Sequence, residues 1–212
     1  MNLPNKLTMF RIFLTVVLIT LLLFPFNMVG VKMPVIQIGM VAADIKYFIA
    51  AGIFIIASLT DFLDGYIARK YNLVTDFGKM TDAIADKMLV NSTLIILSSQ
   101  GIVSPIITVI VIFRDTVVDM IKMISGSKGK VVAAIKTGKV KTTFLMIGII
   151  LKLCYNLPFE LFGLHVADFV LILATLFSII SGIEYYVLNK DIIFENDVEK
   201  KNEKNKKKET VK

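Results

Sequence analysis

Long apolar segments separated by short polar connections make up most of this chain. Six segments are close to the 20 or so residues that an α-helix needs to cross a lipid bilayer. They lie near Leu7–Phe26, Ile45–Ala68, Thr81–Ser99, Ile102–Met123, Ala133–Tyr155 and Val166–Leu188. Proline and glycine occur in the connections between them, as is typical of chain turns. The pattern predicts an all-α integral membrane protein, a bundle of six transmembrane helices.

Lysine and arginine are distributed unevenly over the connections. They gather at the chain start, in the second-to-third connection, and in the fourth-to-fifth connection with its flanks. The opposite connections contain little beyond Lys32 and Lys46. Because basic connections stay on the cytoplasmic side of a membrane, we expect both termini to be cytoplasmic.

Composition and charge limit the kind of molecule further. With 56% hydrophobic residues among 212, the chain is too apolar for an ordinary soluble domain and forms one compact unit. Its net charge of +7 does not indicate a nucleic-acid partner, because the basic residues cluster near the membrane rather than along one face. The single cysteine, Cys154, excludes an intrachain disulfide and provides no zinc site.

The C-terminal segment differs in composition from the rest. From Lys200 to Lys212 it holds seven lysines against Glu203 and Glu209. Apolar residues are scarce there, so we expect a transmembrane domain at 1–190 and a charged, disordered cytoplasmic tail at 191–212. The tail either contacts anionic lipid headgroups or is a solvated segment without a function.

Four aspartates at helical spacing lie in these apolar surroundings. Asp61 and Asp64 are three residues apart, and Asp82 and Asp86 are four apart, so each pair lies on one face of its helix. Two facing helices would bring all four carboxylates into one small volume, where cations must neutralise them. Pairing with lysine or arginine would account for one or two of these acids, but not for four. Oxygen ligands without histidine or cysteine favour Mg²⁺ or Mn²⁺.

Eight positions in this region follow a fixed spacing. They are Asp61, Asp64, Gly65, Ala68, Arg69, Gly78, Asp82 and Asp86, and they resemble the D-x2-D-G-x2-A-R-x8-G-x3-D-x3-D signature of the CDP-alcohol phosphotransferase family. The opening from Pro4 to Arg11 is similar to the P-N-x-L-T-x-x-R start of that family's bacterial phosphatidylglycerophosphate synthases. The segments Gly138 to Thr142 and Ser181 to Tyr185 resemble the same branch. The resemblance extends from about Leu3 to Lys190.

The resemblance implies a role for each acid. Asp61, Asp64 and Asp82 would hold divalent ions, two in number, on the pyrophosphate of a CDP-linked lipid. Asp86 would be the general base and a further metal ligand. The resemblance also implies a homodimer in the inner, cytoplasmic membrane of a bacterium, with the site facing the cytoplasm.

The remaining signature residues would serve the CDP-lipid. Gly65, Ala68 and Gly78 would leave room for the nucleotide, although small residues also allow tight helix packing in membranes. Arg69 is suited to a phosphate oxygen.

A second group of residues indicates how an acceptor would bind. Its candidate members are Arg114, Lys139, Lys141, Thr8 and Arg11. The first three either pair with Asp115 or Asp119 and snorkel to a helix end, or bind a phosphate on the acceptor. Thr8 and Arg11 either line the same pocket or meet lipid headgroups.

The function that this resemblance implies is transfer of a phosphatidyl group from CDP-diacylglycerol to sn-glycerol 3-phosphate, with release of CMP. Inositol phosphate is an alternative acceptor that the same cations could hold, and serine fits this charge less well. A divalent-cation transporter is the alternative from another class, since intramembrane acids also line ion paths. An ion path would not require Gly65, Ala68, Arg69 and Gly78.

Overall fold

Six long helices lie where the sequence predicts them. The structure, a computed structural model, describes residues 3–31, 33–39, 41–71, 76–130, 132–133 and 135–209, without the side chains of residues 3, 27, 69, 76, 77, 79 and 194–209. The helices are α1 (Leu3–Leu23), α2 (Ile45–Lys70), α3 (Asp76–Ser99), α4 (Pro105–Ser127), α5 (Lys136–Leu153) and α6 (Val166–Glu209). Two short 3₁₀ turns, Phe26–Val29 and Phe159–Phe162, lie in the connections. The predicted six-helix architecture is therefore confirmed.

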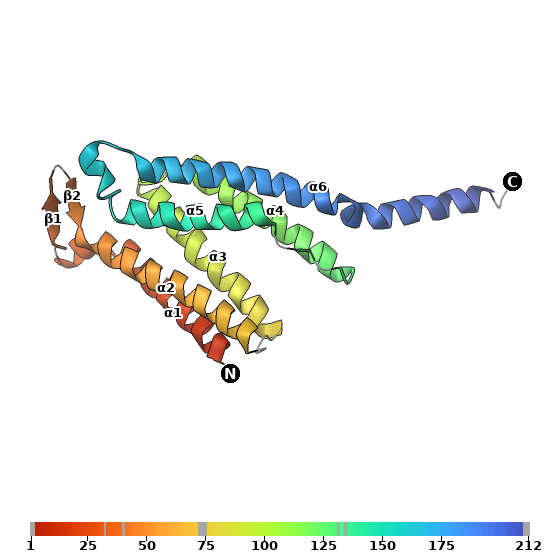
Figure 1. The fold of residues 1–212 in the computed structure, drawn as a ribbon, viewed down its shortest axis with the longest axis horizontal. Coiled ribbons are helices and arrows are strands. Elements are labelled where there is room, and N and C mark those ends of the chain that lie inside the picture. The colour runs from red at the N-terminus through yellow and green to blue at the C-terminus, as the bar shows by residue number, and fades with distance from the viewer. Residues whose placement is uncertain are drawn as a thin grey trace.

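The helices alternate in direction and form two groups (Figure 1). Helix α1 packs against α2 and α3, and α6 packs against α4 and α5. The groups lie together at one end of the molecule and diverge toward the other (Figure 1). The alternation brings the start of α1, the end of α2 and the start of α3 to the diverging end.

A continuous apolar core joins the two groups. Leu18 of α1, Phe54 of α2 and Leu97 of α3 are fully buried together with Ile149 of α5 and Leu171 of α6. Between membrane helices such side chains stabilise the fold through van der Waals packing rather than through removal from water. This core occupies the end where the helices converge, so the diverging end is available for polar groups.

Helices α5 and α6 approach closely at Gly148. A Cβ atom on Gly148 would lie 2.6 Å from Cδ2 of Leu171, a distance at which the Leu171 side chain or the helices must shift. Small residues commonly serve such close approaches in membrane proteins.

Three helices are long and apolar enough to span a membrane in the described part of the chain. They are Pro4–Leu23 within α1, Ile45–Ala68 within α2 and Val166–Ile193 within α6. Helices α3, α4 and α5 carry more charge in their sequences, which lowers their mean hydropathy. Many of these charged side chains line a cavity between the helix groups. They therefore lie at the cavity rather than on the outer face of the bundle.

A β-hairpin between α1 and α2 adds to the predicted all-α fold. Strands β1 (Val35–Ile38) and β2 (Val41–Asp44) are antiparallel, with Val35 opposite Asp44. Asp44 then begins α2, because its carboxylate accepts the backbone N–H of Lys46 at 3.0 Å. The short β-branched run before Gly39 could have predicted the first strand. The apolar segments on both sides of it obscured this signal.

The C-terminal segment belongs to the longest helix, α6. A disordered tail was expected from residue 191, whereas the backbone of α6 continues as a helix to Glu209. Lysine and glutamate are good helix formers, and Glu203 precedes Lys207 by one helical turn, a spacing that favours the helix. The lipid contact predicted for this segment concerns side chains outside the described residues, and it stays a prediction.

Candidate active site

Three of the four signature aspartates meet at the diverging end. Asp61 and Asp64 come from the last turns of α2 and Asp82 from the second turn of α3. One carboxylate oxygen from each lies within 4.8 Å of the others. The acid cluster, defined as Asp61, Asp64 and Asp82, is thus close enough for one cation to contact all three.

Arg11 of α1 lies in the middle of the acid cluster. Its guanidinium forms ion pairs with Asp61 and Asp64, and Nη1 lies 3.0 Å from Oδ1 of Asp82. The arginine side chain is fully buried, and its Nε has no hydrogen-bond partner among the described residues. Three carboxylates around one monovalent cation leave net negative charge, so the donor set suits a divalent ion.

Thr8, one helical turn before Arg11, contacts the same cluster. Its buried hydroxyl lies 3.1 Å from the carbonyl oxygen of Pro4 and 3.3 Å from Oδ2 of Asp64, so these two acceptors share its single proton. The sequence analysis expected Thr8 and Arg11 in the acceptor pocket or at lipid headgroups. The structure places both against the acids, and neither is among the residues that line the cavity described below.

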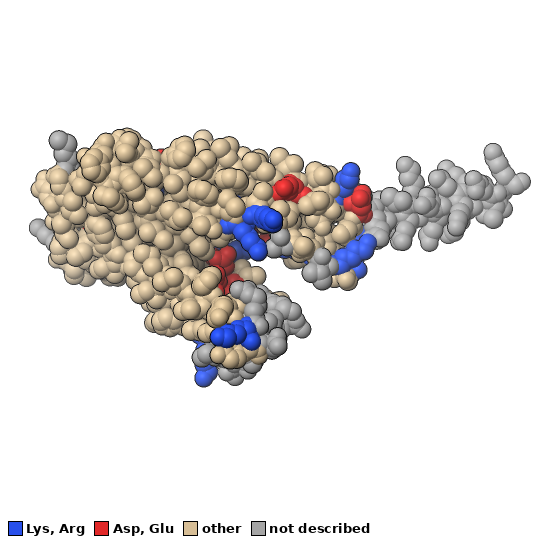
Figure 2. All heavy atoms as spheres, viewed as in Figure 1, with Lys and Arg blue, Asp and Glu red and all other residues tan. Residues whose placement is uncertain are grey.

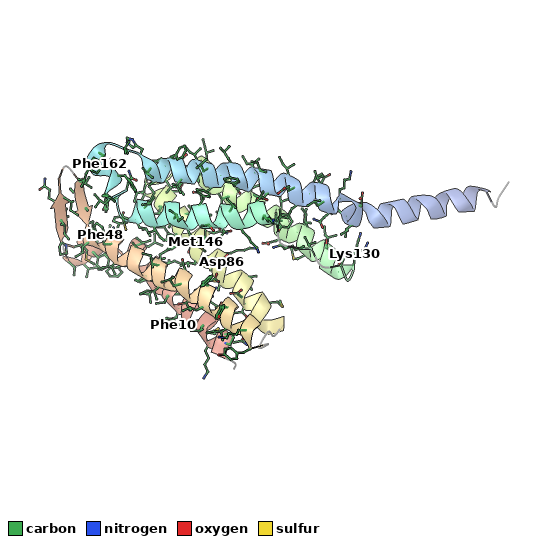
Figure 3. All side chains as sticks on the ribbon, in the orientation of Figure 1. Phe10, Phe48, Asp86, Lys130, Met146 and Phe162 are labelled. Atoms are coloured by element: carbon green, nitrogen blue, oxygen red, sulfur yellow. The ribbon has the colours of Figure 1, made fainter. Side chains whose placement is uncertain are left out.

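Asp86 lies one turn beyond Asp82 on α3 and is separate from the three-acid cluster. It lines the cavity between the helix groups, and its carboxylate has no ion-pair partner in the part of the chain that the structure describes. Met146 of α5 lines the same cavity, and Figure 3 labels both residues near the region between the helix groups. An unpaired carboxylate at a cavity wall is free to accept a proton.

A basic group from α4 and α5 forms the opposite wall. Lys141 donates to both carboxylate oxygens of Asp115 at 2.8 Å, and Nη1 of Arg114 donates to the same carboxylate at 2.9 Å. One carboxylate therefore compensates the buried Lys141 and the partly buried Arg114, which leaves a local excess of positive charge. Lys139 is exposed nearby and also lines the cavity.

The acids and the basic group share one open cavity of about 930 Å³. Asp61 and Asp86 line it on one side, and Arg114, Lys139 and Lys141 line it on the other. Figure 2 shows acidic and basic side chains gathered around the hollow between the two helix groups, while most of the remaining face carries no charge. The volume lies within the range of small-molecule sites in proteins.

One further cation, Lys122, increases the positive charge of the cavity. Lys122 and Lys139 line it without a carboxylate partner among the described residues, whereas Lys87 forms an ion pair with Asp119. A cavity with carboxylates on one wall and unpaired cations on the other can hold a metal-bound anion beside a second, free anion.

Comparison with known proteins identifies the family. The family model for CDP-alcohol phosphatidyltransferase matches residues 1–181. The chain belongs to the CDP-alcohol phosphatidyltransferase family. The family resemblance drawn from the aspartate signature is thereby confirmed.

Several curated bacterial relatives of this family carry one name, CDP-diacylglycerol–glycerol-3-phosphate 3-phosphatidyltransferase. The Bacillus subtilis protein is 39% identical over 89% of this chain and 95% of its own length. The Mycoplasma pneumoniae protein is 35% identical over 76% of this chain and 70% of its own. The Rickettsia typhi protein is 34% identical over 87% of this chain and 95% of its own.

The signature residues expected at the nucleotide lie on both sides of the connection between α2 and α3. Gly65 and Ala68 follow Asp64 on α2 and are partly buried, and Gly78 lies one turn before Asp82. The backbone of Arg69 is helical, but its side chain is outside the described residues. Their predicted contact with the CDP-lipid stays a prediction.

The structure adds residues to which the sequence analysis assigned no role. Ser181 and Tyr185 of α6 contact Arg114, through a hydrogen bond of 2.8 Å and a ring contact of 5.4 Å. Both belong to a segment that resembles the family, and they are four residues apart, a spacing that places them on one helix face. The shared helix face of Ser181 and Tyr185 could be recognised from the sequence. The sequence could not indicate that this face contacts Arg114.

Proposed function

We propose that this chain transfers the phosphatidyl group of CDP-diacylglycerol to sn-glycerol 3-phosphate, producing phosphatidylglycerophosphate and CMP. The observation that carries the proposal is the single cavity with Asp61 and Asp86 on one wall and Arg114, Lys139 and Lys141 on the other. One wall suits a metal-bound pyrophosphate and the other a phosphorylated acceptor. The shared name of the bacterial relatives supports the same reaction.

Asp61, Asp64 and Asp82 would hold the divalent ions, Mg²⁺ or Mn²⁺ and two in number, with Asp86 as a further ligand. Their geometry supports this, because the three oxygens converge within 4.8 Å and all are hard donors. The bound ions would neutralise the charge of the pyrophosphate during phosphoryl transfer. Arg11 supplies positive charge to the same carboxylates, and the hydroxyl of Thr8 lies against Asp64. We assign both residues to the metal side of the site.

Asp86 acts as the general base. It accepts the proton of the acceptor hydroxyl, and the hydroxyl oxygen forms a bond to the phosphorus on the lipid side. The bond between that phosphorus and the oxygen of CMP breaks, so CMP leaves with the electron pair. The position of Asp86 on the cavity wall, without an ion-pair partner in the described residues, supports this role.

Gly65, Ala68 and Gly78 leave room for the nucleotide, and Arg69 contacts a phosphate oxygen of the CDP-lipid. The fixed spacing of these residues around the acid cluster supports the assignment.

Arg114, Lys139 and Lys141 bind the phosphate of the acceptor. Arg114 presents a planar fork of N–H donors that suits a phosphate, while Asp115 holds Lys141 beside it. The unpaired Lys122 and Lys139 favour an anionic acceptor over serine, which carries no net charge at neutral pH.

The chain crosses the bacterial inner membrane six times as a homodimer, with both termini and the cavity opening on the cytoplasmic side. The three apolar helices support membrane insertion. The basic residues around the diverging end support its cytoplasmic position. Helices α3, α4 and α5 complete the six spans, since their charges lie largely at the cavity rather than against lipid.

The deciding experiment offers purified protein CDP-diacylglycerol with glycerol 3-phosphate, inositol phosphate or serine, in Mg²⁺ or Mn²⁺. We expect CMP release and phosphatidylglycerophosphate with glycerol 3-phosphate. A preference for serine or inositol phosphate would overturn the acceptor assignment. Metal flux into vesicles without CMP release would favour the transporter instead.

A further inference from the structure

The guanidinium of Arg114 is held from three sides. Nη1 donates to Asp115 at 2.9 Å, Nη2 donates to the hydroxyl of Ser181 at 2.8 Å, and the group lies 5.4 Å from the centre of the Tyr185 ring. The side chain is only 12% exposed. A long side chain held in this way keeps one conformation instead of sampling several rotamers.

Two glycines leave the space that Arg114 occupies. A Cβ atom on Gly182 of α6 would lie 3.1 Å from Cγ of Arg114, and one on Gly138 of α5 would lie 3.4 Å from its Nη2. The first distance is tighter than ordinary van der Waals contact. An alanine at position 182 therefore requires the stem of Arg114 to shift by a few tenths of an ångström.

Ser181 is itself oriented by its helix. Its hydroxyl donates to the backbone carbonyl of Ser178 at 3.0 Å, so the proton points away and a lone pair of the oxygen faces Arg114. The hydroxyl of Tyr185 accepts the backbone N–H of Ile135 at 3.3 Å, which ties the ring to the start of α5. Both partners of Arg114 on α6 are thus fixed before any ligand binds.

We propose that Ser181, Gly182 and Tyr185 are positioning residues that hold Arg114 in the orientation needed to bind the acceptor phosphate. The proposal rests on the function proposed above. Asp115 alone would leave the guanidinium free to rotate about one contact, whereas the contact with Ser181 fixes its plane. Arg114 lines the adjoining cavity, and its side chain has more N–H groups than the two that Asp115 and Ser181 accept, so donors remain for an anion there. Pre-oriented donors bind an anion without an ordering cost at the moment of binding.

The test measures KM for both substrates and kcat in Ser181→Ala. We expect KM for glycerol 3-phosphate to rise about 5- to 30-fold, below the full effect of losing a charged hydrogen bond because two contacts remain. KM for CDP-diacylglycerol and kcat should change less than about twofold. Ser178→Ala is the matched control: it lies one turn earlier on α6, is equally buried, and its hydroxyl has no partner in the described residues. An equal effect in Ser178→Ala would assign the loss to helix packing and overturn the proposal.

A double-mutant cycle separates positioning through Arg114 from any independent role. In an Arg114→Ala background, Ser181→Ala should cause no further rise in KM for the acceptor. The same rise in both backgrounds would overturn the proposal. If the wild-type protein makes no phosphatidylglycerophosphate, or Arg114→Ala leaves KM unchanged, the proposed function fails instead.

Gly182→Ala provides a second test of the positioning role, and this test does not depend on Ser181. We expect it to raise KM for glycerol 3-phosphate about fivefold or more through the displaced arginine, and to have no effect once Arg114 is alanine. Gly126→Ala is its control, since nothing lies within 4 Å of the added Cβ there. Unchanged KM in both Gly182→Ala and Ser181→Ala would refute the positioning role.

Discussion

Arg11 Nη1 and Asp82 Oδ1 lie 3.0 Å apart, although the residues are separated by 71 positions in the chain. The same arginine pairs with Asp61 and Asp64. Helix α1 thus supplies the positive charge that lies among the acids of α2 and α3. A divalent ion that binds these carboxylates must compete with Arg11.

Arg11→Met should therefore raise the affinity of the protein for divalent ions while lowering its stability without them. Breaking a buried ion pair costs about 3–5 kcal/mol, and the partial exposure of Asp61 and Asp82 reduces this to roughly 2–3 kcal/mol. We expect a lower Tm in EDTA and a larger Mn²⁺-induced rise in Tm than in the wild-type protein. Lys87→Met, which breaks the separate pair with Asp119, should not enlarge the Mn²⁺ effect. An Mn²⁺-induced rise no larger in Arg11→Met than in wild type would contradict the competition.

Removal of metal should abolish CMP release, and loss of one ligand should raise the metal requirement. Asp61→Asn and Asp82→Asn each remove a charged donor from the cluster. We expect their activity to need several-fold to tens-of-fold more Mg²⁺ for half its maximum, measured by titration from EDTA-treated protein. Asp168→Asn, whose residue pairs with Lys152 at 2.7 Å, is the control and should titrate like wild type. Full activity in EDTA would remove the metal from the reaction.

Asp86→Asn should nearly abolish turnover while the CDP-lipid still binds. The amide has the size of the carboxylate but cannot accept the proton, and general-base catalysis contributes about 10²- to 10⁴-fold to the rate. The measurement is kcat beside direct binding of CDP-diacylglycerol. Asp119 lines the same cavity but is paired with Lys87, so Asp119→Asn should lower kcat far less. Near-normal kcat in Asp86→Asn would exclude it as the base.

Helical spacing was sufficient to predict that the acids meet. Asp61 and Asp64 share a face because they are three residues apart, and the apolar segments indicated that α2 and α3 are neighbours. The separation of Asp86 from the three-acid cluster follows from the same geometry, since four residues advance about 6 Å along a helix. Spacing alone did not decide which of the four acids would converge most closely.

The contacts of Arg11 and Arg114 could not be predicted from spacing. Each depends on how a helix far away in the sequence crosses the site, α1 for the acids and α6 for Arg114. Local periodicity carries no information about such crossings. The sequence predicted the cations of the opposite wall and left open whether they pair with an acid or bind a ligand. Only the packed structure shows that Asp115 lies between Arg114 and Lys141 and pairs with both. The binding of a phosphate by the same cations stays part of the proposed function.

The cytoplasmic position of the diverging end can be tested with single cysteines. In a Cys154→Ala background, Gly126→Cys lies on the last turn of α4 and is exposed, and Gln37→Cys lies on the exposed hairpin at the opposite end. We expect an impermeant maleimide to label Gln37→Cys in intact cells and Gly126→Cys only in inverted vesicles. The reverse pattern would invert the topology and place the cavity outside.

Acceptor choice is tested by removing cations from one wall. Arg114→Ala and Lys139→Ala should raise KM for glycerol 3-phosphate more than KM for CDP-diacylglycerol. A lost charged hydrogen bond costs about 1.5–3 kcal/mol, or roughly 10- to 150-fold in affinity. The larger effect should belong to Arg114, which is 12% exposed, since solvent screens the charge of the exposed Lys139. Lys130→Ala, in the connection between α4 and α5 and not among the cavity-lining residues, is the control and should leave both KM values near those of wild type. If both cavity variants keep a normal KM for the acceptor, the phosphate does not bind at this wall.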